Sequence, residues 1–248
     1  MTLQQFFQQN PRVALGFSGG VDSAYLLYEA LQCGANVRPY YIKTAFQPRF
    51  EYEDALRVAA QLSAEVCVIS LDILSEPEVA ANPPDRCYHC KRALFSALQE
   101  RARADGYPVL IDGTNASDDA SDRPGMRALG ELSVRSPLRE CGLTKPMIRA
   151  LSKQAGLFTW DKPAYACLAT RIPAGATVSE DLLRRVEAAE DLLFGLGFSD
   201  FRVRVFHGAA RLQLRAEQFQ RAVAAKAEIV RLIKPYFETI LLDMEERK

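Results

Sequence analysis

VALGFSGGVDS, residues 13–23, joins an apolar run to a short segment of glycine, serine and aspartate. The apolar run predicts a buried strand, and the residues that follow the glycines have the pattern of a helix. A strand that ends in Ser-Gly-Gly before a helix leaves free N–H groups at the positive end of the helix dipole. The alternative is a tight turn before an ordinary helix start. The favoured interpretation is an anion site that consists of Ser18, Gly19, Gly20 and Ser23.

Further apolar runs alternate with helical patterns along the first two thirds of the chain. Such alternation predicts an α/β fold with a doubly wound parallel sheet that is covered by helices on both faces. Ligands of these sheets bind beyond the carboxyl ends of the strands, where the strand order reverses. The predicted strands are 13–17, 37–42, 65–71, 109–113 and, more weakly, 133–138, and the predicted helices are 22–33, 50–63, 90–105 and 145–155.

A second pattern begins after an irregular stretch at residues 157–177. An irregular stretch of this length inside a compact chain is usually functional or a linker. We therefore expect two domains, a nucleotide-binding domain at 1–168 and a small α+β domain at 169–248 for substrate binding or oligomerisation. The elements predicted in the second are helix 178–194, strands 200–206 and 210–215, helix 216–235 and strand 239–244.

The composition narrows the class of protein. Lys and Arg number 31 and Asp and Glu number 31, so no global basic field would attract nucleic acid. No apolar run approaches the length of a membrane span, and the start of the chain does not resemble a signal peptide. We therefore expect a cytoplasmic protein whose six cysteines are thiols or metal ligands rather than disulfides.

A second polar loop, DGTNASDD, follows the fourth predicted strand and should reach the same edge of the sheet as the first. Gly113 lets the chain turn there. The polar side chains of this loop offer ligands for ribose, metal or phosphate, and the alternative is an Asx turn without a ligand. The candidates are Thr114, Asn115, Asp118 and Asp119.

Three cysteines stand in contexts that ordinary burial explains poorly. Cys87 and Cys90 form a CxxC pair where a predicted helix begins, and Cys167 lies in the irregular stretch. A zinc ion would need a fourth ligand, and His89 on the same helix should point away from both thiols. An iron–sulfur cluster held by three cysteines leaves one iron open for an additional sulfur. Cys33, Cys67 and Cys141 fit small buried side chains.

These features occur together in a known order. SGGVDS resembles the pyrophosphate-binding loop (PP-loop) of the N-type ATP pyrophosphatases. With NPPDRCYHCK, DGTNASD, RPGMRAL, RSPLRECGLTK, ACLATRIPAG and FRVRVFHGAARL, it resembles the LarE family of sulfur transferases over nearly the whole chain. That family supplies sulfur for a nickel-pincer nucleotide cofactor.

The resemblance implies that ATP adenylates a carboxylate of pyridinium-3,5-biscarboxylic acid mononucleotide, after which sulfur replaces AMP. Two rounds give the dithio product. Asp22 would bind Mg²⁺ beside the leaving pyrophosphate, and Lys43 and Thr44 would lie near adenine and ribose. We expect Gly113, Thr114 and Asp118 of the second loop to be further ATP-binding residues. The family also commonly assembles as homo-oligomers, so we expect one here, while its sulfide donor is not identified.

The family has two sources of sulfur. In one branch the cysteine that matches Cys167 gives up its own sulfur and becomes dehydroalanine. In the other, cysteines that match Cys87, Cys90 and Cys167 hold a [4Fe-4S] cluster. Because this chain has all three, we favour the cluster, with these cysteines and Asp22 as the catalytic residues.

A candidate substrate site lies in the second domain. In FRVRVF, the period of two places Arg202, Arg204 and Phe206 on one face of a strand, where arginines suit phosphate and carboxylate groups. The alternative is a solvated sheet surface. The resemblance implies that Arg202 and Arg204 bind the substrate phosphate, that Glu190 lies nearby, and that Arg171 orients the adenylate or the phosphate.

Two other functions stay open at this point. Several PP-loop enzymes thiolate tRNA, although the neutral charge and the absence of a recognisable RNA-binding segment argue against that activity here. The chain could also be a non-catalytic nucleotide or metal sensor. The complete SGGVDS loop and the acidic second loop favour an enzyme over a sensor.

Overall fold

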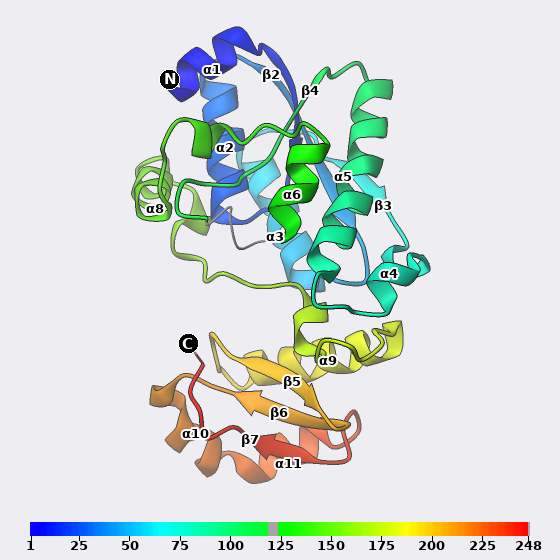
Figure 1. The fold of residues 1–248 in the computed structure, drawn as a ribbon. Coiled ribbons are helices and arrows are strands. Elements are labelled where there is room, and N and C mark those ends of the chain that lie inside the picture. Colours follow the sequence, from blue (N-terminus) through cyan, green and yellow to red (C-terminus); the bar gives the residue numbers. More distant parts are fainter. Residues whose placement is uncertain (119–123, 248) are drawn as a thin grey trace. The chain divides into compact units, whose positions relative to one another are not determined.

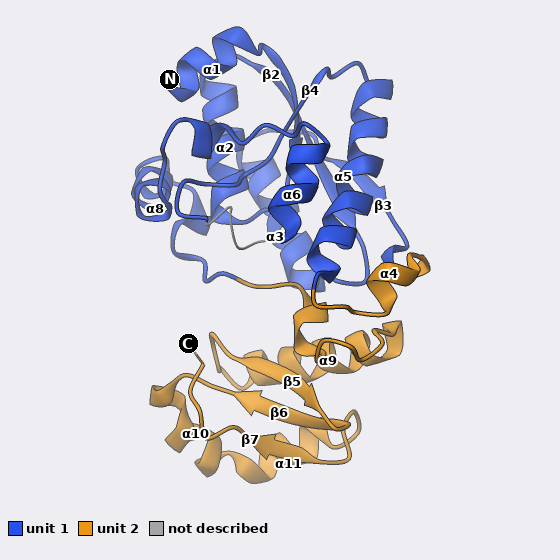
Figure 2. Ribbon diagram, in the orientation of Figure 1, with its two compact units in different colours: residues 1–73, 85–164 blue, residues 74–84, 165–248 orange. Residues whose placement is uncertain are grey.

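The computed structural model describes residues 1–118 and 124–247, and the chain divides into two compact units. Unit 1 comprises residues 1–73 and 85–164, and unit 2 comprises residues 74–84 and 165–248 (Figure 2). The chain leaves unit 1 for the last time at residue 164, a few residues before the expected boundary at 168. Within the described residues, no helix is both long and apolar enough to cross a membrane.

Unit 1 is built on a four-stranded parallel sheet with the strand order β3-β2-β1-β4 (Figure 1). The chain moves outward from β1 to β3 and then returns to place β4 on the other side of β1. This reversal between β1 and β4 confirms the predicted α/β fold and gives the sheet its ligand-binding edge. The strands are β1 (Arg12–Gly16), β2 (Asn36–Lys43), β3 (Cys67–Ser70) and β4 (Val109–Ile111).

Alternation along β1 explains why both faces of the sheet are covered. Val13 and Leu15 pack into one apolar core, whereas Ala14 between them packs into another. The first core contains side chains of α1 (Leu3–Gln9), α2 (Val21–Gln32), α3 (Arg49–Gln61) and α8 (Lys145–Gln154). The second contains side chains of α5 (Arg86–Ala104). The remaining helical segments of unit 1 are α6 (Pro124–Glu131), α7 (Pro137–Glu140) and η2 (Phe158–Asp161), and η1 (Ile73–Ser75) spans the boundary at residue 73.

The weak fifth strand predicted at 133–138 was wrong. Within this described segment only Arg135 forms a parallel bridge, with Ile111 of β4, and α7 begins two residues later at Pro137. Proline has no N–H group for a strand ladder but suits the first turn of a helix, so pairing ends there. The segment nevertheless lies beside β4, where Arg135 exchanges backbone hydrogen bonds with Leu110 and Asp112.

Unit 2 contains a mixed three-stranded sheet with the order β5-β6-β7. The strands β5 (Arg202–Phe206) and β6 (Ala209–Gln213) form an antiparallel hairpin, and β7 (Ile240–Leu242) pairs parallel to β6. The long helix predicted at 216–235 is interrupted at Ala225, where the backbone leaves helical geometry. Its pieces are η4 (Ala216–Gln218), α10 (Phe219–Ala224) and α11 (Lys226–Ile233); η3 (Leu168–Arg171) and α9 (Glu180–Gly195) precede the sheet, and α4 (Pro77–Ala80) lies in the early segment.

The early segment 74–84 is tied to unit 2 by a buried asparagine. The side-chain amide of Asn82 donates to the carbonyls of Pro173 at 2.8 Å and Ala176 at 3.1 Å, and the backbone carbonyl of Asn82 accepts from Gly175 N–H at 2.7 Å. Asn82 is 2% exposed, so these bonds replace water that the side chain has lost. Unit 2 is therefore assembled from two separate parts of the sequence.

The loop after β1 packs tightly on α3. Gly19 has φ = 72°, and a Cβ atom at this position would lie 2.5 Å from Cα of Ala55. Both the backbone conformation and the close approach therefore require glycine. The contact fixes the loop against a helix that belongs to the core of the unit.

We predict that Gly19→Ala destabilises the protein by about 2 to 4 kcal/mol, from unfavourable φ together with overpacking. Gly34→Ala is the matched control, because Gly34 has φ = 71° but a Cβ atom there would meet no described atom within 4 Å. It should cost only about 1 kcal/mol. Urea unfolding of both variants measures the difference. Equal losses would show that α3 does not constrain the loop.

Candidate functional site

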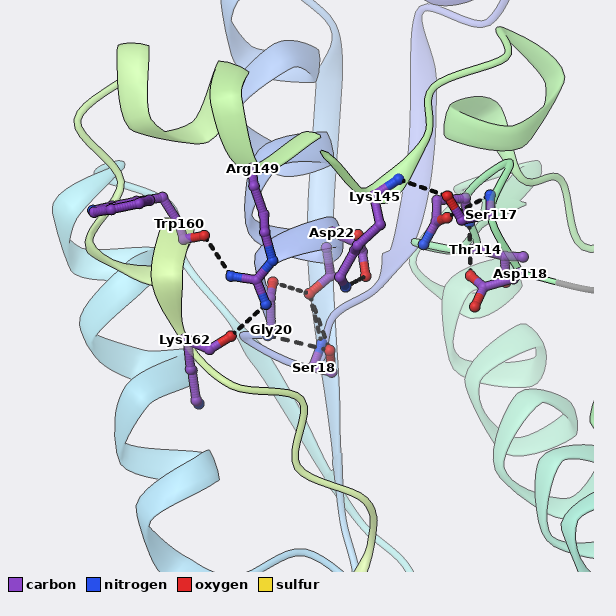
Figure 3. A network of polar contacts seen from close by, with 12 residues as sticks. Ser18, Gly20, Asp22, Thr114, Ser117, Asp118, Lys145, Arg149, Trp160 and Lys162 are labelled. Carbon is purple, nitrogen blue, oxygen red and sulfur yellow. Dashed lines mark hydrogen bonds and ion pairs between the residues drawn. The ribbon is translucent and has the colours of Figure 1, made fainter. Parts of the chain in front are cut away.

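The loop between β1 and α2 is held together by its own polar groups (Figure 3). The hydroxyl oxygens of Ser18 and Ser23 lie 3.1 Å apart, and Gly20 N–H donates to Ser18 Oγ at 3.3 Å. Gly20 is the N-cap of α2 and provides no side-chain cap for the helix. The first N–H groups of α2 are thus left for another acceptor, as a phosphate site requires.

The loop after β4 lies directly against this first loop. A Cβ atom at Gly113 would lie 3.0 Å from the backbone nitrogen of Ser23, so glycine permits the approach. The carboxylate of Asp112, at the foot of the loop, accepts from Thr114 Oγ1 at 2.5 Å and from Ser136 Oγ at 2.6 Å. The structure therefore brings the two predicted loops together at the reversal of strand order.

The second loop contains the Asx-type turn that the alternative interpretation expects. Asn115 N–H donates to Asp118 Oδ2 at 3.0 Å, and Ser117 N–H donates to Asn115 Oδ1 at 2.8 Å. These bonds shape the loop but do not by themselves distinguish a ligand site from a turn. Asp119 lies outside the described residues.

Asp22 is the acidic group in the first turn of α2. Its Oδ2 atom accepts from Lys145 Nζ at 2.5 Å, while its buried Oδ1 atom has no hydrogen-bond partner among the described residues. Desolvation raises the pKa of Asp22 above its ordinary value, and the nearby Lys145 opposes that shift. A buried carboxylate oxygen without a donor fits the hard oxygen ligand that Mg²⁺ prefers.

Two cations of α8, Lys145 and Arg149, belong to this site although the sequence patterns did not indicate them. Lys145 contacts Asp22, and Arg149 donates to the carbonyls of Trp160 at 2.6 Å and Lys162 at 2.8 Å (Figure 3). Lys145 lies 123 positions from Asp22 in the sequence, so no local spacing reveals their contact. The only signal was the occurrence of Lys145 in the motif RSPLRECGLTK.

Lys43 and Thr44 lie at the carboxyl end of β2, which neighbours β1 in the sheet. The Thr44 hydroxyl donates to Gln47 Oε1 at 2.8 Å and accepts from Phe46 N–H at 3.0 Å. Lys43 Nζ lies 5.0 Å from the centre of the Tyr52 ring. Both residues thus share the sheet edge with the first loop, and their contact with adenine or ribose stays a prediction.

All three candidate cysteines are thiols rather than halves of a disulfide. Cys87 is exposed and Cys90 is half-buried in the first turns of α5, which belong to unit 1. Cys167 is half-buried and directly precedes η3 in unit 2. Nε2 of His89 lies 3.4 Å from Asp85 Oδ2. In the described part of the chain, no group of three or more His, Cys, Asp or Glu residues is arranged to hold a metal ion.

A buried ion pair lies next to Cys167 within unit 2. Arg171 Nε donates to Glu190 Oε1 at 2.9 Å, and both side chains are at most 1% exposed. Arg171 Nη1 also donates to Ala166 O at 2.7 Å and lies within 3.4 Å of Cys167 O. Glu190 also accepts from Val203 N–H at 2.9 Å. This pair therefore connects the backbone around Cys167 to α9 and β5.

Arg202 and Arg204 lie on β5 beside this pair. Arg202 is 5% exposed, and its guanidinium lies 4.8 Å from the centre of the Tyr165 ring, whose hydroxyl donates to Glu190. Arg204 donates to Thr170 O at 2.7 Å. Burial lowers the pKa of both arginines, and the like charge of Arg171 lowers it further. An anion at this surface would relieve that repulsion.

Known proteins of similar sequence include enzymes with named activities. The chain is 34% identical, over 86% of its length and 78% of the relative, to the pyridinium-3,5-bisthiocarboxylic acid mononucleotide synthase of Lactiplantibacillus plantarum. It is 37% identical to the Synechocystis protein slr1717, over 98% of this chain and 92% of the relative. A tRNA-specific 2-thiouridylase of Clostridium botulinum is 29% identical over 60% of this chain and 52% of its own. No protein-family model matches the chain.

Sequence, fold and site geometry agree with these relatives. The parallel sheet carries the SGGVDS loop at its point of reversal, and the relatives with named activities are enzymes that transfer sulfur. This excludes the sensor interpretation. The chain belongs to the LarE-like family of PP-loop ATP pyrophosphatases and is an ATP-dependent sulfur transferase.

Proposed function

We propose that this enzyme converts the two carboxylates of pyridinium-3,5-biscarboxylic acid mononucleotide into thiocarboxylates, a step in the biosynthesis of the nickel-pincer nucleotide. The observation that carries the proposal is the relative named for this product, which aligns with 86% of the chain. Loops from both sides of the strand reversal, one of which holds an unpartnered carboxylate oxygen, support it.

In the proposed first step, a substrate carboxylate oxygen attacks the α-phosphorus of ATP. A new O–P bond forms, the bond from the α-phosphorus to the oxygen that bridges the α- and β-phosphates breaks, and pyrophosphate leaves with that oxygen. Ser18, Gly20 and the N–H groups that begin α2 bind this leaving group. Asp22, through its unpartnered Oδ1 atom, would hold Mg²⁺, which when bound would neutralise part of the phosphate charge. Gly113 keeps the second loop close to the start of α2, and Gly19 fixes the first loop on α3.

In the second step, sulfur attacks the activated carbonyl carbon and AMP leaves with the C–O bonding electrons. We propose that the sulfur comes from an iron–sulfur cluster bound by Cys87, Cys90 and Cys167. Three thiols are the soft ligands such a cluster takes, two of them at the start of α5 and one beside η3. When bound, the cluster would supply an iron without a protein ligand that can carry sulfur. The alternative source is the sulfur atom of Cys167 itself.

We propose that Arg202 and Arg204 in unit 2 bind the phosphate of the substrate. The crowding of their charges with that of Arg171 supports an anionic ligand. The expectation that Arg171 and Glu190 touch the substrate stays a prediction. Their bidentate pairing and the bonds from Arg171 to the chain at Ala166 and Cys167 give them an additional role, to hold the Cys167 segment in place.

The proposed function is tested by incubating the protein, supplied with sulfide and reconstituted without oxygen, with ATP, Mg²⁺ and the mononucleotide. We expect AMP, pyrophosphate and the thiocarboxylate product, detected by mass spectrometry of the nucleotides. A parallel reaction with tRNA addresses the second candidate, which the thiouridylase relatives favour. Thiolated tRNA together with an unchanged mononucleotide would replace our assignment with that one.

The sulfur source is tested on the same reaction. With a cluster, the protein contains iron and sulfide, its intact mass after chelation is unchanged by turnover, and Cys87→Ser abolishes both iron binding and repeated turnover. Cys33→Ser is the control, because this half-buried thiol lies at the end of α2. Conversion of Cys167 to dehydroalanine in a single turnover, without bound iron, would establish the sacrificial alternative.

The substrate site is tested by Arg204→Ala. Loss of its charge should weaken binding of the mononucleotide roughly 10- to 100-fold while ATP binding stays within about twofold of wild type. Arg184→Ala is the matched control, because this arginine of unit 2 is exposed and its ion pair with Asp181 is long, at 3.7 Å. Isothermal titration with each ligand separates the effects. Equal weakening of both ligands by Arg204→Ala would remove Arg204 from the substrate site.

A further inference from the structure

The ammonium group of Lys145 has unused hydrogen-bonding capacity beside the first loop. It carries three N–H donors, and its one hydrogen-bond partner among the described residues is Asp22 Oδ2 at 2.5 Å. The Lys145 side chain is 32% exposed, so its other donors are not sealed in the core. The backbone N–H of Lys145 donates to Ser117 Oγ at 2.9 Å, which fixes the start of α8 on the second loop.

The partner of Lys145 is also incompletely bonded. Asp22 Oδ1 is buried and has no hydrogen-bond partner among the residues described, although Oδ2 of the same carboxylate is occupied. A carboxylate oxygen that can accept a cation therefore lies beside an ammonium group that can donate to an anion. A free acceptor on Asp22 beside free donors on Lys145 suits a ligand that carries both charges, such as a nucleotide phosphate with its divalent cation.

The other cations near this point are engaged elsewhere (Figure 3). Arg149, which lies one turn further along α8, donates to the carbonyls of Trp160 and Lys162. Lys162 Nζ forms ion pairs with Asp54 at 2.8 Å and Glu51 at 3.2 Å. The SGGVDS loop contains no lysine or arginine of its own. Arg149 also acts on Asp22 through its charge, but both of its terminal nitrogens already donate to backbone carbonyls, so Lys145 is the cation here whose N–H donors can serve a phosphate.

We propose that Lys145 is a phosphate-binding residue of the nucleotide site. Its ammonium group stays bonded to Asp22 and donates a second hydrogen bond to an oxygen of the β- or γ-phosphate of ATP. During adenylation the broken P–O bond leaves its electrons on the departing pyrophosphate, and Lys145 neutralises part of that charge. The loop thereby obtains, from a helix far along the chain, the cation that a Walker A lysine provides within its own loop. This inference rests on the proposed function only in requiring that the loop bind ATP.

The test is isothermal titration of the full-length protein in EDTA with ATP, inorganic pyrophosphate and AMP. Lys145→Met should weaken binding of ATP and pyrophosphate on the order of 10- to 100-fold and leave AMP within about twofold, because AMP lacks the outer phosphates. Lys145→Arg should retain most of the affinity. Lys153→Met is the matched control on the same helix, since Lys153 is exposed with its Nζ 4.4 Å from the Trp160 ring centre.

A second set of variants separates direct phosphate binding from simple support of Asp22. In an Asp22→Asn background, Lys145→Met should still weaken pyrophosphate binding, whereas a residue that acts only through the carboxylate would have no further effect. The double variant also avoids an unpaired buried carboxylate, so it keeps the test valid if Lys145→Met alone unfolds. Thermal unfolding reports the folding of each variant.

The outcomes distinguish this inference from the proposed function. If the wild type binds ATP and Lys145→Met binds it equally well, or if AMP and ATP weaken together, Lys145 is not a phosphate ligand. If the wild type binds neither ATP nor pyrophosphate, in EDTA or in a second titration with Mg²⁺, both proposals are overturned. If nucleotide binding behaves as expected but no thiocarboxylate forms, the role of Lys145 stands and the proposed substrate is wrong.

Discussion

Close approach of backbone to backbone at two glycines is the constraint on which the nucleotide site depends. Gly19 lies against Ala55 of α3, and Gly113 lies against Ser23 at the start of α2. Neither contact leaves space for a side chain: the Gly19 contact fixes the first loop on α3, and the Gly113 contact brings the loop after β4 against the start of α2, where the sheet reverses its strand order. The site follows from this packing: Asp22 is enclosed, its carboxylate loses water, and its oxygens must find partners in the protein or in a ligand.

The two units handle buried charge in different ways. In unit 1, the carboxylate of Asp22 is paired through one oxygen only among the described residues, which suits a site that gains and loses a charged ligand. In unit 2, Arg171 and Glu190 satisfy each other with two parallel hydrogen bonds inside the core. Breaking such a pair leaves an unpaired buried charge, which is strongly unfavourable, so we expect the Arg171–Glu190 pair to stay intact whether or not a ligand is bound. Arg171 also donates to the backbone carbonyls of Ala166 and Cys167, so the buried pair holds the backbone at Cys167 in place.

The sequence could predict those parts of the structure that depend on residues close together in the chain. Alternating apolar runs identified the four strands of unit 1, and the SGGVDS and DGTNASD segments indicated its ligand-binding edge. The exceptions have physical causes. Pro137 stopped the expected fifth strand, and Lys145 reaches Asp22 only because α8 packs on the same core as α2. The burial of Arg202 contradicts a simple alternation of exposed and buried positions, since its side chain packs on the Tyr165 ring. Contacts between distant segments leave no periodic trace in the sequence.

The bonds of Asn82 have a consequence for modular evolution. Residues 74–84 sit inside the sequence of unit 1, yet their buried amide depends on carbonyls at Pro173 and Ala176. A recombination event that exchanged everything after residue 164 would leave residues 74–84 in place. The Asn82 amide would then face a loop of different sequence in place of residues 173–176. We therefore expect residues 74–84 and the loop at residues 173–176 to be exchanged together between related proteins.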